Sequence, residues 1–341
     1  GLGGAPAQFE SASSESELVE LVRSSRSLDR PLLILGGGSN IVAADGPINA
    51  TVVKMALRGT QVKPTRDQVL VTVGAGETWH DFVEAMTHEG FAGVECLGGI
   101  PGSVGATPIQ NVGAYGQEVS QVIAQVRVLN KKTLKFRTLH HQECAFGYRS
   151  SLFKTSARDQ YIVVSVTFAL RPSGAPSLNY AELKRALPTD ASLMDVFNEV
   201  IRLRRSKSMV YDPKDENHRS CGSFFVNPQL APAEFDALKT RLGADLPSFP
   251  GERGSVKIPA AWLIERAGFE KGTRTAAVGL SSKHALCLVA HDGATSAQLV
   301  GLAQSIRERV ESQLGVRLIP EPEFWGFERL DDRLPDLSSA Q

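Results

Sequence analysis

Glycine clusters interrupt the first part of the chain at the points where apolar runs end. The run Leu32–Leu35 is followed by Gly36-Gly37-Gly38-Ser39-Asn40, and the alternating run Val69–Val73 is followed by Gly74-Ala75-Gly76. A glycine-rich turn after a strand lets backbone N–H groups approach phosphate oxygens without interference from side chains. The clusters therefore predict strands, the first of them buried, that end in turns able to bind a phosphate.

A longer glycine-rich stretch runs from residue 93 to 116 and shows little periodicity. It holds Gly98-Gly99-Ile100-Pro101-Gly102-Ser103-Val104-Gly105 and, further on, Gln110-Asn111-Val112-Gly113-Ala114-Tyr115-Gly116. A loop of this length is typical of a functional segment. None of the clusters is a GxGxxG or a P-loop motif, and turns explain most glycines. Several such loops together nevertheless favour a pyrophosphate threaded between them.

Strands and helices are mixed along the rest of the chain. The pattern predicts a hairpin over 122–129 and 134–139 and a strand over 161–170. It also predicts four helices. One follows a capping box at Ser14 and Glu17, and one spans 193–205. The other two are marked by apolar residues at helical spacing, namely Trp79, Phe82, Val83 and Met86, and Leu299, Leu302, Ile306 and Val310. The turn-rich segment 212–217 is the candidate connection between domains. Because strands and helices do not alternate strictly, the predicted fold class is α+β.

The composition indicates the number of domains and excludes some classes of partner. The 341 residues are 42% hydrophobic and 22% charged, which suits two or three domains with cores of their own. Lys and Arg together number 37, as do Asp and Glu, so the net charge favours neither nucleic acid nor an anionic membrane as a partner. No apolar run reaches the roughly 20 residues that span a bilayer. We expect a soluble, cytoplasmic protein.

The four cysteines lie far apart and form no close pair. Metal ligands normally occur in such pairs, so no metal site is expected. Isolated cysteines of this kind are typical of small buried residues in a reducing compartment.

Several motifs, in the same order along the chain, closely resemble the UDP-N-acetylenolpyruvoylglucosamine reductase (UDP-N-acetylmuramate dehydrogenase) family. They are the glycine clusters at 36–40 and 74–76, the run from Ile100 to Gly116, Phe146-Gly147-Tyr148-Arg149-Ser150-Ser151, Gly222-Ser223-Phe224-Phe225-Val226-Asn227-Pro228 and Glu321-Pro322-Glu323. Each motif alone is moderately specific, whereas the ordered set covers nearly the whole chain and is highly specific.

The resemblance implies an α+β fold: a two-lobed FAD-binding domain of the vanillyl-alcohol-oxidase/PCMH type and a C-terminal α+β substrate-binding domain. It places the first lobe at 1–56, the second at 57–208 with 318–341, and the substrate domain at 209–317. The family pattern carries more residues before Gly3-Gly4, and a shorter N-terminus is expected to weaken the first lobe. The protein is expected to be a monomer.

The resemblance also implies the cofactors, which are non-covalently bound FAD and NADPH as the reductant. The residues that correspond to the FAD site are Gly36, Gly37, Gly38, Ser39, Asn40, Ile41, Gly99, Ile100, Pro101, Gly102, Ser103, Gly105, Ala106, Thr107, Gln110, Asn111, Gly113, Ala114, Tyr115 and Gly116.

The implied reaction reduces UDP-N-acetylglucosamine enolpyruvate to UDP-N-acetylmuramate in peptidoglycan biosynthesis. Hydride passes from N5 of the reduced flavin to C3 of the enol ether, which leaves carbanion character at C2. Tyr148 and Arg149 correspond to the active-site pair, Ser223 to the proton donor for C2 and Glu323 to an acidic partner. A guanidinium suits stabilisation of an enolate, and Glu323 suits a protonated or orienting role.

Four further positions resemble contacts of the UDP-sugar: Tyr180, Lys207, Asn227 and His284. Val226 departs from the pattern, because a lysine often stands there. Because a single flavin N5 must react with both NADPH and the sugar, the two are expected to use one pocket in turn.

Taken alone, each catalytic candidate has a simpler interpretation. Arg149 would be a surface ion-pair residue, Ser223 the start of a buried strand, and Glu323 a solvated edge charge. Two other functions also remain open: an oxidase or dehydrogenase of the same flavin fold with another substrate, and a non-catalytic flavin-binding regulator. Turnover with NADPH and the enolpyruvyl sugar distinguishes the three.

Overall fold

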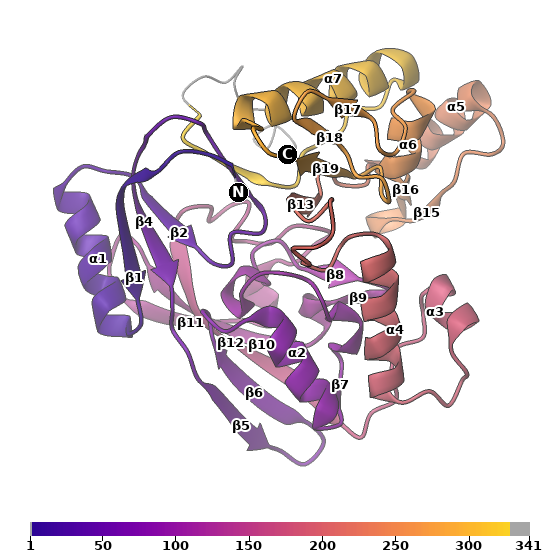
Figure 1. Ribbon diagram of the computed structural model, residues 1–341. Coiled ribbons are helices and arrows are strands. Elements are labelled where there is room, and N and C mark those ends of the chain that lie inside the picture. The colour runs from indigo at the N-terminus through magenta and orange to yellow at the C-terminus, as the bar shows by residue number, and fades with distance from the viewer. Residues whose placement is uncertain (1, 328–341) are drawn as a thin grey trace. The chain divides into compact units, whose positions relative to one another are not determined.

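A computed structural model describes residues 2–327 of the chain (Figure 1). These residues form two compact units. We call residues 6–38 and 49–210 the N-terminal unit, and residues 2–5, 39–48 and 211–327 the C-terminal unit. The boundary between residues 210 and 211 directly precedes the turn-rich segment 212–217 that the sequence marks as a connection.

The first part of the N-terminal unit is a small sheet of three strands in the order β1 (Pro6–Ala12), β4 (Ile48–Met55), β2 (Leu32–Leu35). Strands β2 and β4 are parallel. All four residues of β2 are half-buried, so the expectation of a buried strand is wrong. The reason is its place at the edge of the sheet, where only one flank is covered by a neighbouring strand.

Helix α1 (Glu15–Ser27) lies beside β1 (Figure 1). The Oγ of Ser14 accepts a hydrogen bond of 3.2 Å from the backbone N–H of Glu17, as the predicted cap requires. The carboxylate of Glu17 accepts from the backbone N–H and the hydroxyl of Ser13, at 2.8 and 2.7 Å, rather than from Ser14. The cap is therefore confirmed, but its reciprocal half is shifted by one residue.

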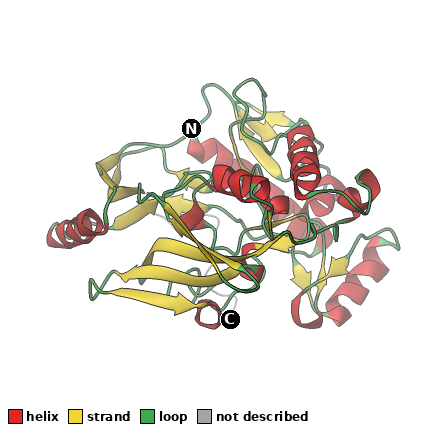
Figure 2. Ribbon diagram, turned by 90° about the horizontal axis from the view of Figure 1, so that it is seen from below, coloured by secondary structure: helices red, strands yellow, loops and turns green. Residues whose placement is uncertain are grey.

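A larger antiparallel sheet is the core of the N-terminal unit, and its long strands are seen in Figure 2. The order is β11 (Phe136–His140), β10 (Ile123–Asn130), β12 (Tyr161–Pro172), β6 (Val69–Gly74), β5 (Thr60–Pro64), with β7 (Phe91–Ala92) paired to β12. The predicted hairpin and both predicted strands of this sheet are confirmed, with ends that differ by one or two residues.

The helices of this unit are α2 (Trp79–His88), α3 (Ala181–Ala186) and α4 (Leu193–Ser206). Helix α2 packs on the large sheet through its apolar face. The ring centroids of Trp79 and Phe82 lie 5.7 and 4.9 Å from that of Phe168 on β12. The predicted helices over 193–205 and around Trp79 are confirmed, because burial of one face is what their periodicity encodes.

The glycine-rich stretch after β7 is folded more tightly than an irregular loop. It contains short 3-10 turns at Glu95–Leu97 and Val104–Ala106 and the hairpin of β8 (Gly113–Ala114) and β9 (Gln117–Glu118). Glu95 is 1% exposed. Its carboxylate accepts hydrogen bonds from the N–H groups of Gly93 and Ser177 and from the Gln117 amide, at 2.7 to 2.8 Å. These bonds compensate the cost of burying the carboxylate.

The C-terminal unit contains two antiparallel sheets and three helices. The sheets are β13 (Ser220–Ser223), β19 (Cys287–Ala290), β18 (Val278–Leu280), β17 (Arg274–Thr275), and β14 (Gln229–Leu230), β16 (Val256–Lys257), β15 (Phe249–Pro250). The helices are α5 (Pro232–Leu242), α6 (Ala260–Arg266) and α7 (Ser296–Leu314). The predicted stripe on α7 is confirmed, since all four of its residues are buried.

A parallel pair formed by β20 (Glu323–Trp325) and β3 (Ile41–Ala43) completes the C-terminal unit. The three-part division is finer than the two units and stays a prediction. Its last residues, 328–341, lie outside the described part of the chain.

All four cysteines are free thiols; Cys221 is half-buried and the others are buried. Within residues 2–327, every helix is too short or too polar to cross a membrane. The same residues contain no cluster of three His, Cys, Asp or Glu side chains that could bind a metal ion.

We predict that Phe168→Ala destabilises the N-terminal unit by about 3 to 5 kcal/mol, because the ring is fully buried against α2 and its removal leaves a cavity. Chemical denaturation followed by circular dichroism measures the shift. Val62→Ala on strand β5 is the control: this side chain is 49% exposed, so its loss costs within about 0.5 kcal/mol. Equal shifts for the two variants would contradict the packing.

Candidate functional site

The glycine clusters at 36–40 and 74–76 pack closely against the cluster at 98–105. A Cβ atom on Gly37 would lie 2.6 Å from the Cα of Gly102, and one on Gly105 would lie 2.5 Å from the Cβ of Ala75. Contacts under 3.0 Å are essentially never seen for a real Cβ. Glycine is therefore required at these positions by the space available, not only by turn conformation.

Hydrogen bonds fix the same segments to one another. The N–H groups of Val104 and Gly105 donate to the carbonyls of Glu77 and Ala75 at 2.8 and 2.9 Å, and the N–H of Trp79 donates to Gly102 at 3.1 Å. The Lys54 ammonium donates to the carbonyl of Gly36. The turns are thus held before any ligand binds. Their walls are backbone, which is what a diphosphate group requires of a binding loop.

Arg149 lies in the N-terminal unit beside the β8–β9 hairpin. Its Nη2 donates to the carbonyl of Gly113 at 2.6 Å and its Nη1 to that of Asn111 at 3.4 Å. Its Cζ lies 5.3 Å from the ring centroid of Tyr148. The structure therefore brings the predicted pair, Tyr148 and Arg149, together with two of the predicted cofactor residues.

A second cluster of the same unit contains Tyr115, Tyr180 and Lys207. The two tyrosine rings meet edge to face with centroids 5.2 Å apart. The Nζ of Lys207 lies 5.9 Å from the Tyr115 ring and forms an ion pair of 3.0 Å with Glu182. Burial raises the pKa of Tyr115 to about 12, so this phenol remains neutral in the physiological range.

Sequence reasoning missed Glu182 and Arg204 in this cluster. Arg204 on α4 is only 5% exposed, and its Nη2 donates to the carbonyl of Met209 at 2.7 Å. A Cβ on Gly99 would lie 3.4 Å from its Nε, which places the guanidinium next to a predicted cofactor loop. In the sequence, Arg204 stands within a charged helical run that is typical of a solvated face, so only the fold reveals its burial.

Ser223 ends strand β13 in the C-terminal unit, opposite Cys287 of β19. The register shifts between Ser220 and Ser223, and Gly222 within this bulge has φ +76°. A bulge turns the following side chain out of the regular alternation, and glycine adopts a positive φ at little cost. The Gly-Ser pair of the motif therefore has a structural reason that acts on the direction of Ser223.

The segment after Ser223 is joined to the segment that carries Glu323. The N–H of Glu321 donates to the carbonyl of Phe224 at 2.8 Å. The N–H of Glu323 donates to the carbonyl of Asn40 at 3.0 Å, and the Asn40 amide donates to the carbonyl of Glu321 at 3.3 Å. Hydrogen bonds thus link three segments distant in sequence: the one that follows Ser223, the one that carries Glu323, and the turn at Asn40.

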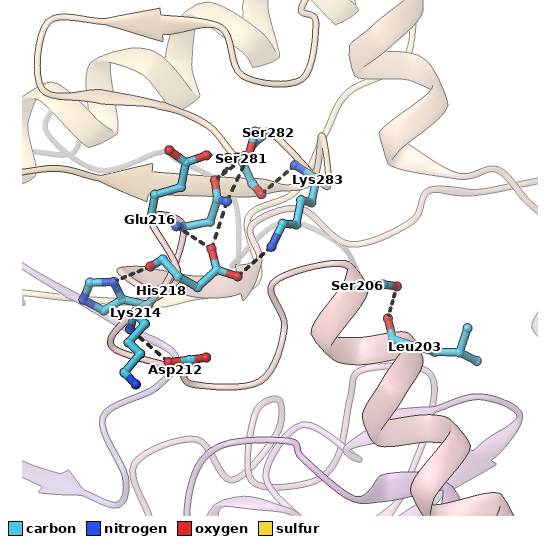
Figure 3. A network of polar contacts seen from close by, with 11 residues as sticks. Leu203, Ser206, Asp212, Lys214, Glu216, His218, Ser281, Ser282 and Lys283 are labelled. Atoms are coloured by element: carbon cyan, nitrogen blue, oxygen red, sulfur yellow. Dashed lines mark hydrogen bonds and ion pairs between the residues drawn. The ribbon is translucent and has the colours of Figure 1, made fainter.

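A polar network fixes the loop before His284 (Figure 3). Asn217, 4% exposed, accepts from the N–H of Ser282 at 3.0 Å and donates to the Ser282 hydroxyl at 3.1 Å. Lys283 forms an ion pair of 2.9 Å with Asp215. The network joins the start of the C-terminal unit to the loop of His284. Sequence reasoning interpreted segment 212–217 only as a connection.

The side chain of Asn227 has a structural contact in addition to its predicted one. Its Oδ1 accepts a hydrogen bond of 2.9 Å from the N–H of Ala260, the first residue of α6. Thr107, a predicted cofactor residue, is 2% exposed, and its hydroxyl donates to the carbonyl of Val104 at 2.8 Å. Both side chains thus stabilise the local fold.

The glycine turns and the group of Ser223 and Glu323 lie in segments that match known protein families. Residues 6–134 match the family described as FAD binding domain, and residues 212–325 match the UDP-N-acetylenolpyruvoylglucosamine reductase, C-terminal domain. The reductase of that name from Thermobifida fusca is 46% identical over 96% of this chain and 94% of its own length. The chain belongs to the UDP-N-acetylenolpyruvoylglucosamine reductase family. The Streptomyces coelicolor member is 41% identical over 94% of this chain and 86% of its own length.

The fold agrees with that of a solved member of the family. The crystal structure of UDP-N-acetylenolpyruvylglucosamine reductase from Thermus caldophilus is similar with a TM-score of 0.62 and 23% identity, covering 92% of this chain and 91% of that one. The predicted α+β fold, an FAD-binding domain of the PCMH type with a C-terminal domain, is confirmed. The chain is a flavin-dependent oxidoreductase with FAD as its cofactor.

The glycine turns fit this cofactor, because backbone walls without room for a Cβ suit the diphosphate of FAD. The predicted cofactor residues divide between the units. The N-terminal unit contains Gly36, Gly37, Gly38, Gly99, Ile100, Pro101, Gly102, Ser103, Gly105, Ala106, Thr107, Gln110, Asn111, Gly113, Ala114, Tyr115 and Gly116, and the C-terminal unit contains Ser39, Asn40 and Ile41. Their contacts with FAD stay predictions.

We predict that Gly37→Ala lowers FAD retention. The new Cβ displaces the Gly102 turn, and loss of one or two hydrogen bonds to a charged group costs about 1.5 to 3 kcal/mol each, which is at least tenfold in affinity. The ratio of visible flavin absorbance to protein after dialysis measures it. The control is Gly46→Ala, where a Cβ meets nothing within 4 Å. Full flavin retention in Gly37→Ala would refute this assignment.

We also predict that Tyr115 ionises at unusually high pH. Its pKa is raised from about 10 to about 12, so the neutral phenol is favoured in the folded protein. The stability due to this shift is present below pH 10 and is lost as the pH rises toward 12. Tyrosinate absorbance of the parent minus that of Tyr115→Phe measures the titration, with circular dichroism to confirm folding. A difference curve with its midpoint at the ordinary value is inconsistent with burial of the phenol.

Proposed function

We propose that the protein catalyses the NADPH-dependent reduction of UDP-N-acetylglucosamine enolpyruvate to UDP-N-acetylmuramate, a cytoplasmic step of peptidoglycan biosynthesis. Membership of the family over 96% of the chain supports this reaction. The observation that carries it is the hydrogen-bonded group that joins the Ser223 strand to the Glu323 segment and to the Asn40 turn. A generic flavin domain would keep the glycine turns but has no need of this group.

FAD, when bound, supplies the hydride that reduces the enolpyruvyl double bond at C3. The protein then has to stabilise negative charge at C2, which is delocalised into the neighbouring carboxylate. Arg149 suits this role because its guanidinium is permanently charged and is already oriented by two backbone carbonyls. Preorganised charge of this kind lowers the barrier without reorganisation during the reaction.

Ser223 is the proposed donor of the proton that C2 receives. An aliphatic hydroxyl is a weak acid, so the transfer depends on the strong basicity of the carbanion and on accurate placement. The bulge at Gly222 supports such placement, since it fixes the direction of the following residue. Glu323 is proposed to orient the reacting group, and its backbone is held by Asn40.

The UDP-sugar is proposed to contact Tyr180, Lys207, Asn227 and His284. Lys207 suits the diphosphate because its ammonium carries a positive charge at a half-buried position, and the ion pair with Glu182 fixes its place. NADPH also carries a diphosphate, so the same lysine can serve both ligands in turn. We therefore propose one pocket that binds NADPH and then the sugar.

Anaerobic flavin spectroscopy tests the reaction. We expect NADPH to bleach the visible flavin band and UDP-N-acetylglucosamine enolpyruvate to restore it. Bleaching without recovery would exclude this substrate and favour another oxidoreductase of the same fold. Bound flavin that NADPH does not bleach would favour a flavin-binding regulator.

We predict that Ser223→Ala slows recovery of the flavin band by about 10²- to 10⁴-fold, the usual contribution of a positioned acid. Bleaching by NADPH should remain within about threefold of the parent, because the proton donor acts only after the hydride has been transferred. Ser305→Ala on α7 is the control, since this serine lies in the same unit, is exposed, and donates its hydroxyl to the carbonyl of Gly301 within its own helix. Equal loss in both half-reactions would argue against a donor role.

A further inference from the structure

Asn111 occupies an unusual position next to Arg149. Asn111 is 1% exposed, and its backbone has φ +47°, in the left-handed region. Asparagine is among the few residues other than glycine that adopt this conformation with ease. The position therefore selects a small residue tolerant of positive φ, but these properties alone do not require an amide.

Hydrogen bonds explain the amide. The Nδ2 of Asn111 donates to the Glu118 carboxylate at 2.9 Å and to the carbonyl of Gly147 at 3.0 Å. Its Oδ1 accepts from the N–H of Ser120 at 3.1 Å. Both N–H donors and the carbonyl oxygen of this side chain are thus engaged by protein groups. These bonds give the asparagine a structural role besides the cofactor contact that the family resemblance implies.

Two routes connect this amide to the guanidinium of Arg149. The first is through the acceptors: Arg149 donates to the carbonyl of Asn111 itself and to that of Gly113, two residues further on. The second is through the turn that carries Arg149, because the amide holds the carbonyl of Gly147. Gly147 and Ser150 exchange hydrogen bonds of 3.0 and 3.1 Å around the turn.

Arg149 itself has φ +52°, a conformation that costs free energy for an arginine and persists only when neighbouring contacts enforce it. The contacts of Asn111 act on Arg149 at two places. One is the turn that contains Arg149, and the other is the pair of carbonyls to which its guanidinium donates. The amide of Asn111 is thus linked by hydrogen bonds both to the turn of Arg149 and to the segment whose carbonyls accept from its guanidinium.

We propose that Asn111 is the positioning residue for Arg149, with Glu118 as the carboxylate that orients the Asn111 amide. This role rests on the proposed function, in which Arg149 stabilises negative charge on the substrate. Asn111 does not touch the reacting atoms. A misplacement of about 1 Å in a charged group of this kind can cost about 10²-fold in rate.

The first test uses Asn111→Gly, because glycine accepts the positive φ and so removes the amide without adding backbone strain. Rates are compared per bound flavin, because Asn111 is also a predicted cofactor residue, and we expect recovery with the enolpyruvyl sugar to slow by about 10²-fold, several times more than bleaching by NADPH. Asn130→Ala is the matched control: its Oδ1 likewise accepts backbone N–H bonds, here from Lys132 and Thr133 in the turn after β10.

A double-mutant comparison separates positioning from general damage. If Asn111 acts through Arg149, Asn111→Gly should add little to the loss caused by Arg149→Lys, so that the double variant recovers within about threefold of Arg149→Lys alone. Multiplied losses, or a loss in Asn111→Gly no larger than in Asn130→Ala, would overturn the role. Asn111→Asp, which keeps the acceptor for Ser120 but loses both donors, should reproduce the slow recovery.

A measurement without substrate distinguishes this role from the proposed reaction. Phenylglyoxal modifies arginine side chains, and peptide mass spectrometry reports the rate at residue 149. We expect Arg149 to be modified several-fold faster in Asn111→Gly than in the parent, because the guanidinium is no longer held on the two carbonyls. An unchanged rate would overturn the positioning role even if the enzyme reduces the sugar. A faster rate in Asn111→Gly, together with a parent protein that fails to reduce the sugar, would support positioning and refute the function.

Discussion

Direct contact of backbone with backbone at the glycine turns is the constraint on which the N-terminal unit depends. Gly37 meets Gly102, and Gly105 meets Ala75, at separations that leave no room for a Cβ. Such contacts bring strand ends and turns closer than side chains would permit, and the N–H groups of Val104 and Gly105 are then used to fix them. The result is a surface of peptide groups fixed by bonds within the protein, which reduces the ordering that binding requires.

Between the strands, the irregular segments are fixed by the hydrogen bonds of buried polar side chains. Glu95, Asn111 and Asn217 are each at most 4% exposed, and each binds backbone or side-chain groups of segments distant in sequence. Apolar side chains could fill the same volume but would not specify which peptide group lies opposite. Hydrogen bonds have direction, so irregular segments held by them can be as well defined as helices. This explains how functional loops without periodicity can keep accurate geometry.

Local patterns in the sequence predict the elements but not their long-range partners. The strands of the large sheet and the helices α2, α4 and α7 follow from alternation and helical spacing, because burial of one face imposes those periods. The pairing of β20 with β3 has no local signal, and neither has the burial of Arg204. The family motifs name Arg149, Ser223 and Glu323, yet they do not identify the amide of Asn111 as an internal bond, because an asparagine in a glycine-rich loop is equally suited to a ligand.

The pairing of β3 with β20 also has a consequence for the order in which the protein is made. The ribosome releases residues 41–43 early, whereas Glu323–Trp325 emerges near the end of the described chain. Until then the edge of β3 has no neighbour on that side, and the carbonyl of Asn40 awaits its donor. The residues of the N-terminal unit end at residue 210, so all of them are available while synthesis of the rest continues. The C-terminal unit is closed last, by the strand that carries Glu323, so a nascent chain acquires its acidic active-site candidate and the final bond to its cofactor turn in a single event.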